Sequence, residues 1–201
     1  MKIHTLTLGA YQTNTYIVEN GRSCAVIDPG YEPETILAFL RQKNLTVDAI
    51  LLTHGHFDHV GAVEAIVSAT GCKLWMSESD WSQPTDPIHT YFYPIANCDF
   101  TEVQFFEDQE HIIAAGLNFL VLATPGHTYG SVCFLCEDAL FSGDTLFSGS
   151  CGRTDLPGGN RNLIRESLER LAKLEGNYTV YPGHGESTTL AQEKQYNPYM
   201  R

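Results

Sequence analysis

The chain has 201 residues, 43% of them hydrophobic and 18% charged, a composition that predicts a single globular domain over residues 1–201. Its 24 acidic and 12 basic side chains give a formal net charge of −12, which argues against nucleic acids and anionic membranes as partners. No run of about 18 uncharged apolar residues predicts a membrane span. Residues 1–5 lack the start of a signal peptide, and six cysteines are too few for a disulfide scaffold, so we expect a cytoplasmic protein.

Short β-rich segments dominate the chain, and helices interrupt them at a few places. Alternating or β-branched residues predict strands at 3–8, 13–19, 23–28, 47–53, 72–76, 117–123, 131–136, 139–142 and 178–181. Apolar residues at helical spacing predict a helix that begins at Pro33, and further helices at 58–70 and 162–174. This mixture predicts an α/β fold in which packed sheets are covered by helices.

Secondary structure is hardest to predict for residues 78–110, because proline, aspartate and aromatic residues interrupt any periodicity. We expect a loop over a site there. Five aromatic side chains are candidates for a pocket wall, but we interpret them as packing residues: Tyr91, Phe92, Tyr93, Tyr129 and Phe147. Cys133 and Cys136 have a CxxC spacing on a predicted strand. Residues three apart on a strand face opposite sides, so we interpret both cysteines as packing residues too.

The strongest functional signal is the HxHxDH segment at 54–59, which follows directly on the buried strand predicted at 47–53. It contains four potential metal ligands: His54, His56, Asp58 and His59. His54 and His56 point the same way on extended backbone, whereas Asp58 lies at the start of a predicted helix, where the dipole favours a carboxylate. Imidazole and carboxylate ligands together suit zinc, iron or manganese better than calcium or magnesium.

Three further residues each follow a predicted strand and a glycine: His127, Asp144 and His184. Because active-site residues of α/β sheets gather at strand ends, we expect their loops to converge with residues 54–59 at one edge. Seven ligands are too many for one tetrahedral ion, and they match two ions with three ligands each and one bridging carboxylate. The histidines without this context are interpreted as non-ligands: His4, His89 and His111.

These motifs resemble those of the metallo-β-lactamase superfamily, and within it the glyoxalase II-like hydrolases. The resemblance extends from about residue 8 to 199 and rests on HxHxDH at 54–59, Val-Ile-Asp-Pro-Gly at 26–30, Thr-Pro-Gly-His-Thr at 124–128, Ser-Gly-Asp-Thr-Leu-Phe at 142–147 and Pro-Gly-His-Gly at 182–185. It implies an αββα sandwich of two mixed sheets flanked by helices, with the site at one edge. Asp28 would orient a ligand or the loop beneath the site.

The resemblance also implies which residues bind which metal ion. One ion would take His54, His56 and His127, the other would take Asp58, His59 and His184, and Asp144 would bridge the two. Both would be divalent ions, zinc in the first place, with iron or manganese as alternatives.

The implied activity is hydrolysis of an acyl bond by a hydroxide held between the two ions, with Asp58 orienting the nucleophile. A thioester such as S-lactoylglutathione suits this chemistry, since its thiolate leaving group needs little protonation near neutral pH. We therefore expect a small anionic thioester as the substrate, and no nucleic-acid or membrane partner.

Arg153 lies just past Asp144, in the segment Cys-Gly-Arg-Thr-Asp at 151–155. In glyoxalase II-like enzymes a basic residue here holds the glutathione carboxylate, and Arg153 matches it; a structural pair with Asp155 is an equally good interpretation. The aromatic residue usual after the last histidine is missing, because Gly185 and Glu186 follow His184. The chain ends 17 residues after His184, so we expect the short single-domain branch without the C-terminal helical domain of glyoxalase II.

Three other interpretations stay open. Persulfide dioxygenases share HxHxDH and the Cys-Gly-Arg-Thr-Asp segment, but they bind one iron through two histidines and one aspartate. The same fold also hosts lactonases and β-lactamases. A non-catalytic metal-binding protein is the third, although a complete ligand set argues against a degenerate site.

Overall fold

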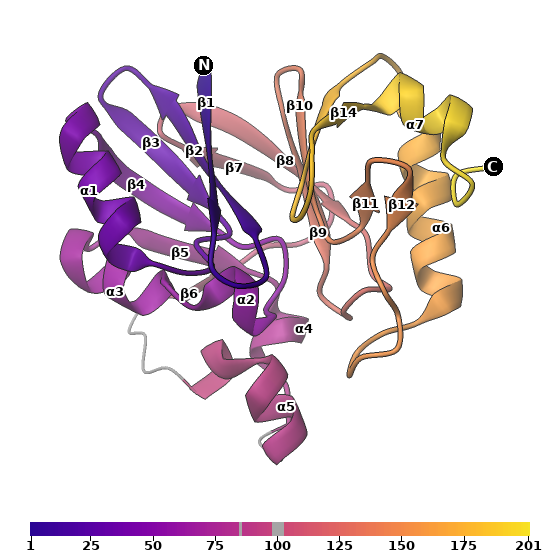
Figure 1. The fold of residues 1–201 in the computed structure, drawn as a ribbon, viewed down its shortest axis with the longest axis horizontal. Coiled ribbons are helices and arrows are strands. Elements are labelled where there is room, and N and C mark those ends of the chain that lie inside the picture. Colours follow the sequence, from indigo (N-terminus) through magenta and orange to yellow (C-terminus); the bar gives the residue numbers. More distant parts are fainter. Residues whose placement is uncertain (85, 98–102) are drawn as a thin grey trace.

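A computed structural model describes residues 1–84, 86–97 and 103–201 and contains two six-stranded sheets that pack face to face (Figure 1). The first sheet follows the chain order β1 (Lys2–Leu8), β2 (Thr13–Asn20), β3 (Ser23–Ile27), β4 (Thr46–Leu51), β5 (Lys73–Met76) and β6 (Val103–Phe105). Strands β1 to β3 pair antiparallel, whereas β3 to β6 pair parallel.

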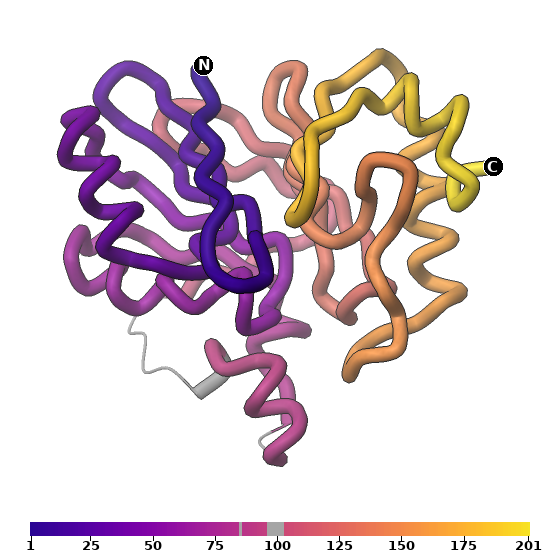
Figure 2. Tube along the Cα trace, viewed as in Figure 1, coloured from indigo at the N-terminus to yellow at the C-terminus, as the bar shows by residue number. Residues whose placement is uncertain are grey.

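The second sheet has the order β14 (Thr188–Thr189), β13 (Thr179–Pro182), β10 (Ala139–Gly143), β9 (Val132–Cys136), β8 (Leu117–Ala123) and β7 (His111–Ala114). Its pairs are antiparallel except for the parallel pair of β10 and β13. A separate hairpin joins β11 (Leu146–Phe147) to β12 (Ser150–Cys151). Figure 2 shows that the N-terminal half of the chain builds the first sheet and the C-terminal half builds the second.

Helices cover the outer face of each sheet. The first sheet carries α1 (Pro33–Lys43) and α3 (Val63–Thr70), and the second carries α6 (Arg161–Ala172) and α7 (Leu190–Tyr196). The remaining helices are α2 (Phe57–Val60), α4 (Glu78–Trp81), α5 (Pro87–Phe92) and the 3-10 helix η1 (Pro94–Asn97). The αββα sandwich of two mixed sheets predicted from the sequence is therefore confirmed. Within the described ranges, no helix has the length and apolarity needed to cross a membrane.

Alternation along the strands produces separate cores on the two faces of each sheet. In β3, Val26 faces α1 and α3, whereas the neighbouring Ile27 faces the second sheet. In β9, Cys133 lies in the core beneath α6, whereas Cys136 lies in the core between the sheets. The interpretation of this CxxC pair as packing residues on opposite faces is therefore confirmed.

The single helix predicted at 58–70 is wrong, because α2 and α3 are separate helices that break at residues 61–62. Ala62 donates its N–H to the carbonyl of Pro29 at 2.9 Å. A Cβ at Gly61 would overlap the carbonyl oxygen of Gly30, so only glycine allows this close approach. The contact ends α2 early and fixes the turn at 28–30 against the HxHxDH segment.

The expectation of a loop over a site at 78–110 is wrong about the loop, since α4, α5, η1 and β6 lie in the described parts of this segment, but Tyr91 and Phe92 of α5 do line a cavity. Residue 85 and residues 98–102 fall outside the described residues. Asp86 caps α5 by accepting hydrogen bonds from the N–H groups of Ile88 (3.0 Å) and His89 (3.2 Å). The sequence pattern does not predict β7, β11, β12, β14 and α7, because such short segments show no clear periodicity.

Two neighbouring isoleucines in β7 test the packing of the sheets. Ile112 is 1% exposed in the core between them, whereas Ile113 is 65% exposed. Ile112→Ala should lower the free energy of unfolding by about 2–5 kcal/mol, because it leaves a cavity in that core. The matched control Ile113→Ala should change it by less than about 0.5 kcal/mol. Urea denaturation followed by circular dichroism measures both values, and equal losses would contradict this placement of β7.

Candidate metal centre

The seven predicted ligands meet at one edge of the sandwich, where strands from both sheets end. His54 and His56 follow β4, and α2 carries Asp58 and His59. The other three residues follow strands of the second sheet: His127 after β8, Asp144 after β10 and His184 after β13. Main-chain hydrogen bonds join the sheets here, from Val132 N–H to the carbonyl of Thr53 (2.9 Å) and from Asn14 N–H to that of Gly183 (2.8 Å).

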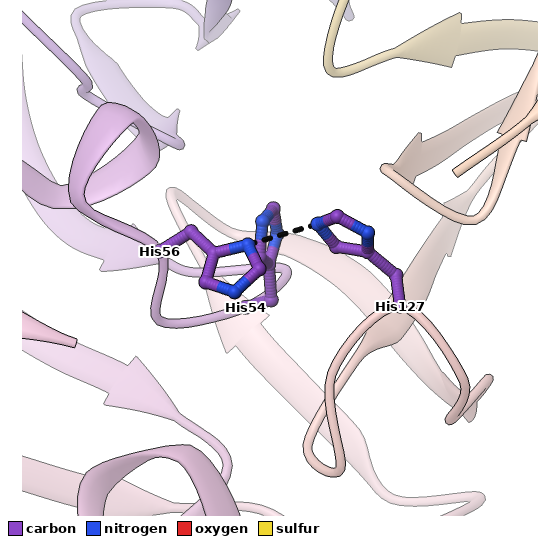
Figure 3. A group of neighbouring side chains, drawn as sticks. All are labelled: His54, His56 and His127. Atoms are coloured by element: carbon purple, nitrogen blue, oxygen red, sulfur yellow. Dashed lines mark hydrogen bonds between the residues drawn. The ribbon is translucent and has the colours of Figure 1, made fainter. Parts of the chain in front are cut away.

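The first ligand group consists of His54, His56 and His127, whose ring nitrogens lie within 4.8 Å of one another. Figure 3 shows the three rings facing one point, two from the loop after β4 and one from the opposite sheet. His56 Nδ1 lies 2.9 Å from His127 Nε2. The Nε2 atoms of His54 and His56 are buried without a hydrogen-bond partner among the described residues.

Hydrogen bonds on the far side of the rings determine which nitrogen carries the lone pair. His127 Nδ1–H donates to the carbonyl of Arg153 at 2.8 Å, so its Nε2 is the free acceptor. His54 Nδ1 lies 3.1 Å from Thr53 Oγ1, whose proton goes to Asp28 Oδ2 at 2.6 Å, so His54 Nε2 is free as well. Lone pairs that converge in a buried space fit a cation, since without one they repel each other.

The second group consists of Asp58, His59 and His184, whose ligand atoms also lie within 4.8 Å of one another. His184 Nδ1–H donates to the carbonyl of Tyr11 at 3.1 Å, and His59 Nδ1–H donates to Asp28 Oδ2 at 2.9 Å. Nε2 is therefore the atom that each ring offers to a cation, and the two Nε2 atoms lie 3.4 Å apart. With the Asp58 carboxylate beside them, these donors fit a divalent cation once the imidazoles are neutral.

Asp144 lies between the two groups. Its Oδ2 is 3.5 Å from Nε2 of His127 in the first group and 3.5 Å from Nε2 of His184 in the second. Its Oδ1 is 3.4 Å from His59 Nε2 and has no hydrogen-bond partner among the described residues. A carboxylate in this place can contact two cations at once.

The two groups differ in their affinity for protons. Burial lowers the pKa of His56 to about 3, so this imidazole is neutral. Burial also acts to lower the pKa of His184, but hydrogen bonds to Asp144 and Asp58 outweigh it and raise that pKa to about 9. His59 shifts the same way, because the charges of Asp144 and Asp28 outweigh its burial and raise its pKa well above the usual value. Without a metal ion, protons occupy the second group.

Asp28 lies behind the ligands rather than among them. It stands at a left-handed backbone position (φ 49°) directly after β3. Its Oδ1 accepts a hydrogen bond from Thr53 N–H at 2.8 Å, and its Oδ2 accepts from Thr53 Oγ1 and His59 Nδ1. Asp28 thus lies near His54 and His59, but these bonds occupy its oxygens and orient the histidines.

Asp80, a fully buried carboxylate in α4, also belongs to the site, although the sequence does not predict it. Its Oδ2 accepts hydrogen bonds from Gly55 N–H (2.9 Å) and Thr128 Oγ1 (2.8 Å), and its Oδ1 accepts from Gly130 N–H (2.8 Å). Asp80 therefore ties the His54–His56 loop to the His127 loop. Its partners lie 25 to 50 residues away in the sequence, and no local motif signals such a contact.

A cavity of about 580 Å³ opens beside the two ligand groups. Tyr91, Phe92 and Phe147 line it, so the interpretation of these three as packing residues is wrong. Tyr93 is a fully buried core residue, and Tyr129 lies outside the cavity lining. Arg153 also lines the cavity and makes a two-point ion pair with Asp155, with both bonds 2.7 Å long.

The three histidines interpreted as non-ligands lie in other surroundings. His4 contacts Glu19 at 2.6 Å, His89 contacts Asp86 at 2.6 Å and His111 contacts the side-chain oxygen of Asn118 at 2.9 Å. The structure therefore separates the eight histidines of the chain into five at the site and three elsewhere.

Asp80→Asn should lower the affinity for zinc while the protein stays folded. The NH2 group of the new amide would face one of the three hydrogen-bond donors that Asp80 now accepts from, so one of the bonds that tie the two ligand loops together would be lost. Loss of a hydrogen bond that orients metal ligands typically lowers metal affinity by about 10- to 100-fold. Calorimetric zinc titration of the metal-free variant measures the change, and circular dichroism checks the fold. Asp86→Asn, at the exposed cap of α5, is the control and should bind zinc like the wild type. Wild-type affinity in Asp80→Asn would exclude this positioning role.

Zinc binding should release protons near neutral pH. The metal-free protein carries a proton on His184, whose pKa is about 9, and a metal ion binds only neutral imidazole. The affinity should therefore rise with pH up to about 9, by about tenfold per pH unit for each proton displaced. Calorimetry in buffers of different ionisation enthalpy counts the released protons. Binding without proton release at neutral pH would contradict the charge state described for the second group.

Comparisons of the sequence and of the structure with known proteins point to the same family. The family model of the metallo-β-lactamase superfamily matches residues 8–184. The hydroxyacylglutathione hydrolase GloC from Haemophilus influenzae is 34% identical over 208 residues, which cover 100% of this chain and 98% of that protein. The resemblance of the motifs to this superfamily and to its glyoxalase II-like members is therefore confirmed, and a hydrolase-type enzyme is supported.

Solved structures show the same architecture. The structure of BLEG-1 B3 metallo-beta-lactamase has a TM-score of 0.87 and 33% identity, and the match covers 99% of both chains. TTHA1623 in a di-iron-bound form has a TM-score of 0.85 and 39% identity, covering 98% of this chain and 99% of that one. ETHE1 from Myxococcus xanthus has a TM-score of 0.83 and 30% identity, covering 98% and 84%. With this fold and these His and Asp groups able to bind metal, the chain belongs to the metallo-β-lactamase superfamily.

Proposed function

We propose that this protein is a binuclear metal-dependent hydrolase of thioesters. One observation carries the proposal: two groups of ligand atoms share Asp144 beside a cavity of about 580 Å³. In four of the five site histidines, a hydrogen bond to the other ring nitrogen directs the lone pair inward. Such preorganisation is the usual requirement of a catalytic metal site.

Two divalent ions are the proposed cofactors. One would bind to His54, His56 and His127, the other to Asp58, His59 and His184, and Asp144 would contact both. Zinc suits this mixture of imidazole and carboxylate donors, and iron and manganese suit it too. The di-iron form of TTHA1623, at 39% identity, supports a site for two ions of this class.

When bound, such ions supply a water nucleophile near neutral pH and polarise the carbonyl of the substrate. Asp58 is the proposed catalytic residue of the chain itself. It lines the cavity, and its Oδ2 accepts a hydrogen bond from Thr13 Oγ1 at 3.3 Å and lies 3.3 Å from His184 Nε2. The carboxylate can accept a hydrogen bond from the attacking water and hold its proton. The leaving thiolate needs no strong acid.

S-lactoylglutathione is the first substrate to test. The relative GloC carries the name of a hydroxyacylglutathione hydrolase, and its match covers all of this chain. Arg153 is the proposed substrate-binding residue, because its guanidinium lies at the cavity; a substrate carboxylate that pairs with it at two points must replace Asp155.

A persulfide dioxygenase is the alternative that a specific observation supports. ETHE1 from Myxococcus xanthus is 30% identical, and the chain carries the Cys-Gly-Arg-Thr-Asp segment at 151–155 that persulfide dioxygenases share. In such an enzyme two histidines and one aspartate would bind a single iron. The match to BLEG-1 likewise keeps β-lactam or lactone hydrolysis among the reactions to be assayed.

Metal content and thiol release test the proposal together. We expect about two metal ions per chain by mass spectrometry after loading with zinc or iron, and thiol release from S-lactoylglutathione. Asp144→Ala should lose one or both ions and the activity, because it removes the shared carboxylate. One iron per chain, no thiol release and oxygen consumption with glutathione persulfide would instead establish the dioxygenase.

A further inference from the structure

Four aromatic side chains form a continuous rim around the cavity, which we call the aromatic rim: Tyr11, Phe57, Tyr91 and Phe92. Tyr11 contacts Phe57 with ring centroids 5.2 Å apart, Phe57 contacts Tyr91 at 5.3 Å, and Tyr91 contacts Phe92 at 5.2 Å. The rim reaches the ligand groups, since the Phe92 ring lies 5.9 Å from that of His56. Three separate segments build it: the turn between β1 and β2, the start of α2 and the end of α5.

The rim leaves apolar surface open to a ligand. Tyr11 is 54% exposed and Tyr91 is 59% exposed, although both touch other rings. Across the cavity, Phe147 and Leu156 continue the apolar lining. Aromatic faces of this kind bind apolar and aromatic groups through burial and ring contacts, and the rim brings no positive charge to pair with a carboxylate.

The same cavity provides little for an anionic thiol. Among its described lining residues, Arg153 is the one Lys or Arg side chain, and both of its bonds to Asp155 are 2.7 Å long. A substrate carboxylate would therefore exchange one carboxylate partner for another and gain little. Glutathione brings two carboxylates and one ammonium group, and the chain itself has a net charge of −12. Away from the metal ions, this net charge opposes the approach of anionic substrates.

We propose that the cavity selects thioesters whose thiol portion is uncharged and apolar, and that Asp155 is a specificity-determining residue that holds Arg153 away from substrate carboxylates. This inference rests on the proposed thioester hydrolysis and names its substrate class. In the reaction, the oxygen of water bonds to the acyl carbon and the C–S bond breaks. The sulfur leaves with the bonding electron pair and takes up one proton, and the new carboxylic acid loses its proton to solvent.

Three thioesters with the same lactoyl group test the proposal on the metal-loaded full chain: those of benzyl mercaptan, N-acetylcysteamine and glutathione. We expect the kcat/KM for the benzyl thioester to exceed that for S-lactoylglutathione by about tenfold or more, because its phenyl group is buried against the rim. The neutral but polar N-acetylcysteamine thioester should lie between them. A higher kcat/KM for S-lactoylglutathione would overturn the proposal and leave thioester hydrolysis intact.

Two variants separate the rim from the ion pair. Tyr91→Ala should lower the kcat/KM for the benzyl thioester by about three- to tenfold, and by a larger factor than that for S-lactoylglutathione. Asp155→Asn should raise the kcat/KM for S-lactoylglutathione by about three- to tenfold through KM, because it frees Arg153, and should change that for the benzyl thioester by a smaller factor. Tyr199→Ala is the control, since Tyr199 is 53% exposed and lies outside the cavity lining. Equal losses for all three substrates in Tyr91→Ala would overturn the role of the rim.

Binding of thioethers distinguishes failure of this inference from failure of the proposed reaction. Benzyl methyl sulfide and S-methylglutathione contain no thioester bond, and calorimetry measures their binding directly. Tighter binding of benzyl methyl sulfide supports the apolar preference even if no thioester is hydrolysed, in which case only the proposed reaction fails. Tighter binding of S-methylglutathione would overturn the preference, whatever the enzyme hydrolyses.

Discussion

The fold of this protein brings uncompensated hydrogen-bond acceptors together where its two sheets meet, and the rest of the site follows from that constraint. Nε2 of His54 and Oδ1 of Asp144 are buried there without a hydrogen-bond partner among the described residues. A buried unpaired polar group costs about 1–3 kcal/mol, and converging lone pairs add repulsion. A cation removes both penalties, and because it binds atoms that converge only in the folded chain, its binding stabilises the fold.

Two buried carboxylates hold this arrangement from behind, and they act on different parts of the sandwich. Asp28 accepts hydrogen bonds from Thr53 and His59, and so it organises ligands that belong to the first sheet. Asp80 accepts from Gly55 on one side and from Thr128 and Gly130 on the other, and so it couples the two sheets. The spacing between His56 and His127 therefore depends on a residue that does not reach the metal position.

Some of the acidic residues of the chain are buried and stabilise loops by accepting hydrogen bonds. Glu193 in α7 is 1% exposed and accepts hydrogen bonds from Gly149 N–H (2.8 Å), Thr188 Oγ1 (2.7 Å) and Asn197 Nδ2 (2.9 Å). It anchors the segment between β11 and β12 at the border of the cavity, as Asp80 anchors the ligand loops. Carboxylates thus serve inside the protein as acceptors for loop N–H and O–H groups.

What the sequence determined by itself is local. The ligand segment 54–59, the glycine before each of the three later ligands and the period-two alternation of the strands depend on neighbours a few residues apart, so they predict packed sheets and the convergence of the loops. The αββα sandwich of two mixed sheets followed from the family resemblance that these motifs carry. Tertiary structure alone decided the break at Gly61, the role of Asp80, the aromatic rim and the pairing of Arg153 with Asp155, in place of an Arg153 left free for a substrate carboxylate. The first three depend on contacts between segments about 25 or more residues apart, where no periodicity records them. The sequence left the Arg153–Asp155 ion pair as one of two equal interpretations. The partner of a charged side chain on a loop depends on the conformation of the surrounding backbone, which the sequence pattern does not give.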